Sequence, residues 1–149
     1  MPCRGCSRRE FLVGSATVAA TAGIAAYVFP GCTQAQRPGA HPATVTVDIS
    51  QPANAALANV GGAVFVNNPL DVDRAIIVYR AAADKVNAFS SRCTHQGGQV
   101  QLPVNGVETC IVHGSQYSSD GTVILGPATQ NLPAYTAVLN GTVITVTVG

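Results

Sequence analysis

Residues 135–148 read YTAVLNGTVITVTV. After the central Asn140-Gly141 pair, Val and Ile alternate with Thr, which is the period of a strand that buries one face. Asn and Gly tolerate the positive φ that a tight hairpin turn requires. The stretch therefore predicts two antiparallel strands, residues 135–139 and 142–148, joined by a short turn.

The same signals extend back to about Ala43. Two further Asx-Gly pairs, Asn105-Gly106 and Asp120-Gly121, indicate more tight turns. Only residues 53–59 suggest a helical turn, and the β-rich runs are residues 44–49, 63–66 and 75–79. We predict an all-β domain, built as a small antiparallel sandwich or barrel.

Composition excludes several classes of protein. A chain of 149 residues provides for one domain. Only 10% of its residues are charged, against about 25% usually, which is too few for a solvated disordered chain. The net charge of +1 excludes a nucleic-acid binder that works by electrostatics. The five cysteines are too few for a disulfide-dense miniprotein.

The basic excess lies in the first 31 residues, which hold three Arg and one Glu. Residues 7–12 read SRREFL, and no charge follows from Phe11 to Gln36. This layout is typical of an export signal, and the paired Arg8-Arg9 before Phe-Leu resembles the twin-arginine (Tat) signal. That resemblance implies export of a protein already folded around its cofactor, to the periplasmic face of the cytoplasmic membrane.

The chain thus divides into a Tat signal or membrane anchor (1–32), a flexible tether (33–42) and a folded domain (43–149). Three fates of the first segment stay open. Residues 11–29 are just long enough to remain as an anchor across ~30 Å of hydrocarbon. Cys32 follows a Gly, as in a lipidation site, and ordinary cleavage near Ala35 would release the domain.

Four side chains in two short loops carry the chemistry. The first loop contains Cys93 and His95, and the second contains Cys110 and His113. Thiolate and imidazole are ligands suited to zinc or iron. Three alternatives follow: a tetrahedral zinc site, a Cys93–Cys110 disulfide beside two incidental histidines, or a [2Fe-2S] cluster with two Cys on one iron and two His on the other.

The order Cys-x-His…Cys-x-x-His resembles the Rieske iron–sulfur family over about residues 43–149. Phe89–Arg92 is similar to the strand before the first loop, and Gly126-Pro127-Ala128 to the family's proline loop, so cluster-binding loops span about 89–128. The resemblance implies a Rieske-type β sandwich or barrel with a small cluster-binding subdomain. Its implied site residues are Cys93 and Cys110 on the iron that stays ferric, His95 and His113 on the iron that is reduced, Ser115 as donor to a bridging sulfide, and Tyr117 as donor to the Cys93 sulfur.

One departure from the family separates this chain from the Rieske subunits of cytochrome bc complexes. Those subunits join the two loops by a disulfide, whose positions here are Gly98 and Val112. The Ser115 and Tyr117 donors still predict a potential in the upper part of the family's range of about −150 to +300 mV. Without the bridge, cluster binding is expected to be coupled to folding of the loops.

The implied function is one-electron transfer without chemistry on a substrate of its own. His41 is the only histidine left over, so the chain lacks the second iron site of an oxygenase. We expect a periplasmic carrier or the small subunit of an oxidoreductase, with a cytochrome or a large subunit as partner. The alternative is the Rieske subunit of a quinol-oxidising cytochrome bc-type complex.

Overall fold

The computed structural model describes residues 42–149, and in this part of the chain nearly all regular structure is β. The strands and the one short helix, a 3-10 helix, are β1 (Ala43–Asp48), η2 (Pro52–Ala58), β2 (Ala63–Val66), β3 (Ile76–Arg80), β4 (Val86–Ser90), β5 (Val107–Thr109), β6 (Gln116–Ser118), β7 (Val123–Leu125), β8 (Ala134–Asn140) and β9 (Val143–Val148). The all-β prediction is confirmed, and the helical turn expected at residues 53–59 is η2. The signal, anchor and tether predicted for residues 1–42 lie outside the described residues, apart from Pro42.

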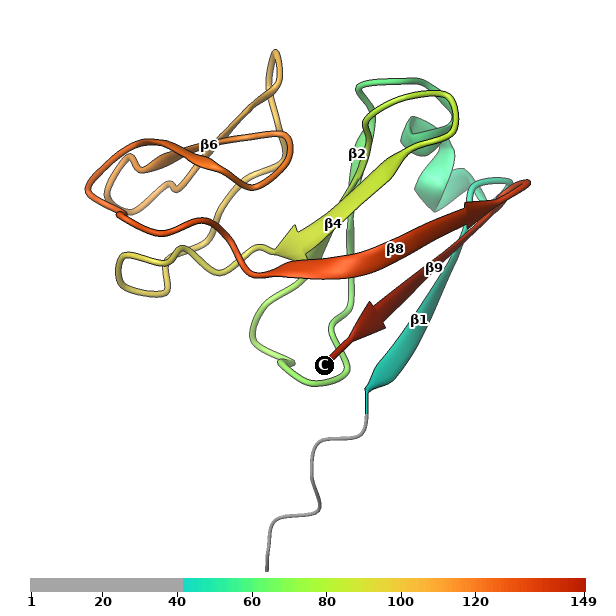
Figure 1. Cartoon of the computed structure of the whole chain (residues 1–149), viewed down its shortest axis with the longest axis horizontal. Coiled ribbons are helices and arrows are strands. Elements are labelled where there is room, and N and C mark those ends of the chain that lie inside the picture. The colour runs from blue at the N-terminus through green and yellow to red at the C-terminus, as the bar shows by residue number, and fades with distance from the viewer. Residues whose placement is uncertain (1–41) are drawn as a thin grey trace, which may run out of the picture. The chain divides into compact units, whose positions relative to one another are not determined.

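Six strands form the base in the order β1-β9-β8-β4-β3-β2, and all neighbours are antiparallel. Strand β8 belongs to both halves of this sheet. Its first residues, Ala134 and Tyr135, pair with β4, whereas residues 136–140 pair with β9. Figure 1 shows β8 running from the end of β4 to the turn at which β9 begins.

The β8–β9 hairpin confirms the opening prediction and moves its turn by one residue. Asn140 pairs with Val143 as the last residue of β8, so Gly141 and Thr142 form the turn. Gly141 has φ +61°, and a glycine at the first turn position is what a type II′ hairpin prefers. Asn140 therefore stays in the strand, where no positive φ is needed.

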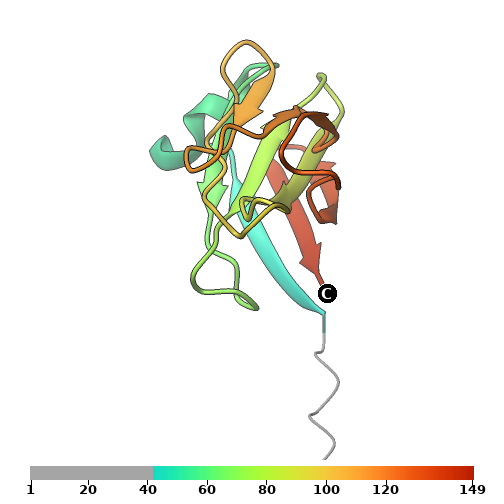
Figure 2. The same ribbon diagram turned by 90° about the vertical axis from the view of Figure 1, so that its left-hand side faces the viewer.

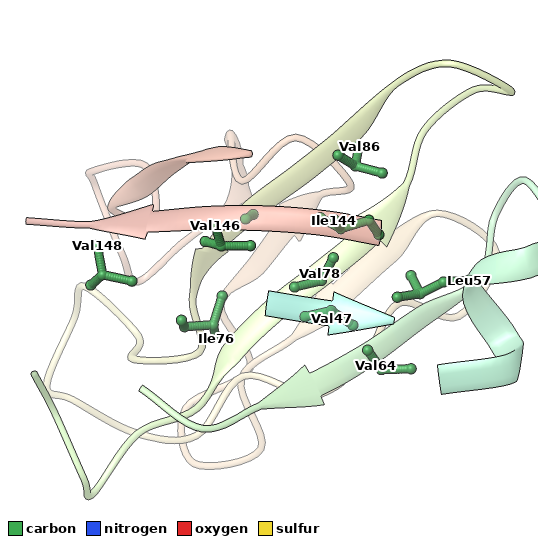
Figure 3. Packing of buried hydrophobic residues seen from close by; sticks show 10 residues of the cluster. Val47, Leu57, Val64, Ile76, Val78, Val86, Ile144, Val146 and Val148 are labelled. Atoms are coloured by element: carbon green, nitrogen blue, oxygen red, sulfur yellow. The ribbon is translucent and has the colours of Figure 1, made fainter. Parts of the chain in front are cut away.

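The base encloses the larger of two hydrophobic cores. Alternate residues of β9 point into it, so that Ile144, Val146 and Val148 are buried while Thr145 and Thr147 between them are half-exposed. Figure 3 shows these side chains meeting others from β1, η2, β2, β3 and β4. The core comprises Val47, Leu57, Val64, Ile76, Val78, Val86, Ala88, Ile144, Val146 and Val148. Each such buried aliphatic side chain of Val, Leu or Ile size contributes about 1.5–3 kcal/mol, and together they hold the two halves of the sheet around one interior.

Strand β3 departs from the alternation that a half-buried strand would show. Ile76, Ile77 and Val78 are all fully buried. Ile76 and Val78 face the base core, whereas Ile77 packs with Phe89 of β4 in a second core. Strands β3 and β4 thus separate the two hydrophobic cores. A strand that is buried on both faces has a continuous apolar sequence.

The second core belongs to a subdomain formed by residues 91–133, between β4 and β8. Strands β5, β6 and β7 form its small antiparallel sheet. In Figure 1 it lies beyond the end of β4, and Figure 2 turns it toward the viewer. Because Phe89 and Ala134 pair directly, the subdomain begins and ends at one place on the base. Across residues 42–149, no helix reaches the length and hydrophobicity of a membrane span.

Candidate metal centre

The two loops that carry Cys and His share one backbone frame. In the first, the N–H of Cys93 donates to Gly98 O (2.8 Å) and the N–H of Gly97 donates to Cys93 O (2.9 Å). In the second, the N–H of Cys110 donates to Ser115 O (2.8 Å) and the N–H of Gly114 donates to Cys110 O (3.0 Å). Each loop therefore turns back on its cysteine within five residues.

A glycine closes each of these turns. Gly97 and Gly114 both lie four residues after the cysteine, with φ of +72° and +75°. A side chain is disfavoured in this left-handed region, because its Cβ would crowd the backbone. The repeated Cys-x-x-x-Gly spacing was visible in the sequence, although sequence reasoning did not use it.

Both cysteines are free thiols in the floor of the site. Cys93 is 2% exposed and Cys110 0%, and both belong to the second core. The Cys93–Cys110 disulfide alternative is therefore not the one this structure adopts. Two buried thiols in one water-excluded region suit a metal group that is bound through sulfur.

The two histidines lie side by side toward the surface. Their Nδ1 atoms lie 3.2 Å apart and the ring centroids 4.7 Å apart, at an interplanar angle of 86°. His113 is exposed and His95 is half-buried. Two nitrogens that bind one ion at ~2.05 Å and a tetrahedral angle would lie about 3.3 Å apart, so this pair is spaced as ligands of a single metal ion.

The four candidate ligands therefore come as a thiol pair and an imidazole pair. Within residues 42–149, no group of three or more Cys, His, Asp or Glu side chains converges on one ion position. A mononuclear Cys₂His₂ site needs all four ligands around one ion. A two-iron cluster needs one pair on each iron, and the residues present fit that second requirement.

Tyr117 lies on β6 against the Cys93 thiol. Its fully buried hydroxyl is 3.2 Å from Cys93 Sγ. Burial alone would raise the pKa of Cys93, but hydrogen bonds from Tyr117 and from the His95 backbone outweigh it and hold that pKa below its usual value. Burial and the neighbouring sulfur raise the pKa of Tyr117. The anionic form of the sulfur is thus stabilised relative to that of a free thiol, and the phenol keeps its proton to donate.

Ser115 is the second buried hydroxyl of the site, at 0% exposure. Its Oγ accepts a hydrogen bond from the N–H of Ala128 at 3.0 Å, which links the Gly126-Pro127-Ala128 loop to the second ligand loop. The Ser115 hydroxyl also contributes to the lowered pKa of Cys93. Because its oxygen accepts from Ala128, its own proton is left to point toward the sulfur atoms of the site.

Gly98 and Val112, where a disulfide was ruled out from the sequence, are in direct contact. A Cβ on Gly98 would lie 2.8 Å from Val112 Cγ2 and 2.9 Å from Cys110 Sγ. Both distances are shorter than a carbon atom tolerates. The absent side chain therefore leaves the Cys110 sulfur free to face the centre.

The Gly98→Ala variant is expected to lose cluster, since its new methyl group displaces the Cys110 sulfur or Val112. Overpacking of this kind costs about 1–3 kcal/mol. The iron content of the purified protein measures the loss. Gly126→Ala is the matched control, because its Cβ would meet only atoms at 3.6 Å or beyond. Equal iron content in both variants would contradict the role assigned to Gly98.

Arg74 binds the backbone of the first loop. The sequence alone did not indicate this role. Its Nε and Nη2 both donate to Gly97 O, at 3.1 and 2.6 Å. Nearby, Arg92 and Asp71 form an ion pair at 3.5 Å. The β2–β3 connection thus holds the backbone beside His95, an arrangement that only the tertiary structure reveals.

Glu108 is a second residue that the sequence did not indicate. It pairs with Tyr117 across β5 and β6, is 0% exposed, and neither carboxyl oxygen has a hydrogen-bond partner among the described residues. Burial, helped by the charge of Asp120, raises its pKa to about 8. The carboxyl group is therefore protonated at neutral pH, which avoids a buried unpaired charge.

Comparisons with known proteins bear on the same region. The family model described as the Rieske [2Fe-2S] domain matches residues 58–136, just over half of the chain. The cyanobacterial plasma membrane Rieske protein PetC3 from Synechocystis PCC 6803 is similar at 30% identity and a TM-score of 0.56, over 68% of this chain and 97% of that one. No curated protein sequence matches the chain.

Two further solved structures share the fold at lower identity. The ferredoxin of carbazole 1,9a-dioxygenase from Nocardioides aromaticivorans IC177 has 23% identity and a TM-score of 0.50, over 70% of this chain and 95% of that one. The quaternary ammonium Rieske monooxygenase CntA has 14% identity and a TM-score of 0.55, over 70% of this chain. The match covers only 31% of CntA, so most of that enzyme has no counterpart here.

Proposed function

Because the chain belongs to the Rieske [2Fe-2S] domain family, whose members bind such a cluster, we propose that it transfers single electrons as a redox protein. When bound, the cluster supplies one-electron exchange. The proposed ligands are two thiolates on one iron and two imidazoles on the other, namely Cys93, Cys110, His95 and His113. The chain then acts as an electron-transfer protein and not as an enzyme with a substrate of its own.

The observation that carries this proposal is the gradient of exposure across the four ligands. Cys93 and Cys110 are at most 2% exposed, whereas His113 is exposed and His95 half-buried. Electrons therefore have their shortest route to a partner through the imidazole edges. The thiols, packed in the second core, keep water from the sulfur side.

The residues around the thiols set the electrochemistry of the proposed centre. Tyr117 and Ser115 are hydroxyl donors facing the sulfur positions. Hydrogen bonds to sulfur favour the more negative, reduced state. We expect a midpoint potential in the upper part of the family's range of about −150 to +300 mV.

We propose that the protein works on the periplasmic side of the membrane, as a carrier or as the small subunit of an oxidoreductase. Support comes from the Tat-like Arg8-Arg9 pair and the uncharged residues 11–36. A cluster assembled before export fits a pathway that carries folded proteins. Its partner is then a cytochrome or the large subunit of an oxidoreductase, and residues 1–32 leave the domain anchored, lipidated at Cys32 or released.

A second candidate is the Rieske subunit of a quinol-oxidising cytochrome bc-type complex. The Ser115 and Tyr117 donors favour it, because they are typical of high-potential members. The Gly98–Val112 contact, where such subunits have a disulfide, counts against it. We therefore place quinol oxidation second.

Spectroscopy of the purified full chain tests the proposed function. The reduced protein is expected to give the EPR and visible absorption spectra of a [2Fe-2S] cluster with mixed Cys and His ligands. A colourless protein that binds one zinc ion would overturn the proposal. Membrane fractionation with mass analysis of the N-terminus distinguishes the anchored, lipidated and released forms. Added quinol distinguishes the two candidate roles, because it should reduce the cluster only where the protein is part of a quinol-oxidising complex.

A further inference from the structure

Thr94, which lies between the first two proposed ligands, joins three parts of the site. Its Oγ1 is 2.6 Å from Gln130 O, in the connection that leads to β8, and 3.1 Å from Tyr117 Oη. Its backbone N is 3.3 Å from the same Tyr117 Oη. Tyr117 Oη in turn is 3.2 Å from Cys93 Sγ. The phenol hydroxyl is therefore surrounded by polar partners within a buried site.

The protons of these groups can be assigned by elimination. A carbonyl oxygen only accepts, so the single hydroxyl proton of Thr94 is committed to Gln130 O. The backbone N–H of Thr94 donates to Tyr117 Oη. In the contact between the two hydroxyls, Thr94 Oγ1 is left as an acceptor and Tyr117 must donate. The one proton of Tyr117 thus has two acceptors at similar distances, Cys93 Sγ and Thr94 Oγ1.

We propose that the Thr94 hydroxyl competes with the Cys93 sulfur for the Tyr117 hydrogen bond and so lowers the midpoint potential. This inference rests on the proposed function, because it takes Cys93 as a cluster ligand. The sulfur is the stronger acceptor when the centre is reduced and more negative, so the O–H then points to sulfur. In the oxidised state Thr94 receives the bond and stabilises that state.

No proton leaves Tyr117 in this process. The O–H bond only changes direction, and the electron comes from the donor protein or from the chemical reductant used in a titration. Thr94 is therefore a positioning residue that acts through Tyr117. The described contacts give Ser115 no competing acceptor for its proton, and its oxygen accepts a hydrogen bond from the N–H of Ala128.

The Thr94→Val variant of the full chain, loaded with cluster, removes the competing acceptor at almost unchanged volume. Its midpoint potential is expected to rise, by about a threefold change in the redox equilibrium constant, or about 28 mV at ~59 mV per tenfold. Thr94→Ser keeps the hydroxyl and should restore the original potential. Thr94→Ala, which also removes the hydroxyl, should shift the potential in the same direction and is measured alongside.

The decisive comparison repeats Thr94→Val in a Tyr117→Phe background. With no phenol proton to compete for, the potential of the double variant should equal that of Tyr117→Phe alone. If Thr94→Val shifts the potential equally in the Tyr117→Phe background, Thr94 acts through loop geometry and the proposal is overturned. The proposal is also overturned if the potential is unchanged or lower in both Thr94→Val and Thr94→Ala. Failure of the proposed function would look different, because the unmodified protein would then lack the EPR signal of the cluster.

Discussion

The Cys93→Ser variant is expected to lose the [2Fe-2S] cluster while the six-stranded base stays folded. The ten residues of the base core do not include Cys93, which packs in the second core. The two loops also meet at the bridge between Val100 and Cys110 and at the bond from the Ile111 N–H to Gln99 O at 3.1 Å, beside the Tyr117 contacts described above. A bound cluster would join Cys93 and His95 of the first loop to Cys110 and His113 of the second, so its binding energy would add to the folding energy of these loops.

Limited proteolysis with visible absorption and far-UV circular dichroism measures this outcome. Cleavage within residues 91–133 should become faster by about tenfold or more, since each 1.4 kcal/mol of lost local stability raises the open fraction tenfold. His113→Ala should behave similarly. Gln96→Ala, at an exposed position of the first loop, is the matched control and should keep its colour and protection. Undiminished protection in a cluster-free variant would refute the coupling.

The Ser115→Ala and Tyr117→Phe variants are each expected to lower the midpoint potential. Each removes one hydroxyl donor to a sulfur that becomes more negative on reduction. A hydrogen bond to a charged group contributes about 1.5–3 kcal/mol, which sets an upper limit of roughly 65–130 mV per donor at ~59 mV per 1.4 kcal/mol. The measured shift should be smaller than this limit, because only the difference between the two redox states counts. It should be smaller for Tyr117→Phe than for Ser115→Ala, because Thr94 also attracts the Tyr117 proton.

A redox titration of the purified variants provides the measurement. Tyr135→Phe is the matched control for Tyr117, because the Tyr135 hydroxyl lies in the base and contacts Asn68 at 3.2 Å. Ser119→Ala serves the same purpose for Ser115. A negative potential in the unmodified protein, or no decrease in either donor variant, would remove the assignment of Ser115 and Tyr117 as tuning residues.

Local sequence patterns sufficed for the β class and for the candidate ligands. The Val/Ile–Thr alternation of residues 142–148 reappears as alternate burial along β9, because a strand with one buried face repeats every two residues. The Asn105-Gly106 turn was also predictable: both residues have positive φ, 52° and 77°, which few other residue pairs tolerate. Spacing rules of this kind act within a few residues, so they are readable without the fold.

The residues that the sequence did not reveal act across long separations. Arg74 reaches Gly97 from 23 positions away, and Thr94 meets Gln130 across 36 positions. The unbroken apolar run of β3 is explained only by two cores on its two faces. Glu108 has an ordinary charged side chain in the sequence, and its neutral state follows from its burial in the fold, helped by the charge of Asp120.

By itself, then, the sequence determined the β architecture and the pairing of one Cys and one His in each loop, and its family resemblance indicated Ser115 and Tyr117 as candidate donors. The tertiary structure alone decided that the thiols are buried while the imidazoles reach the surface. It also decided that Gly98 fits against Val112, and that the Tyr117 proton has two acceptors. The physical reason is that residue type and spacing set which bonds a side chain can make, whereas burial and competition depend on neighbours that only folding brings together.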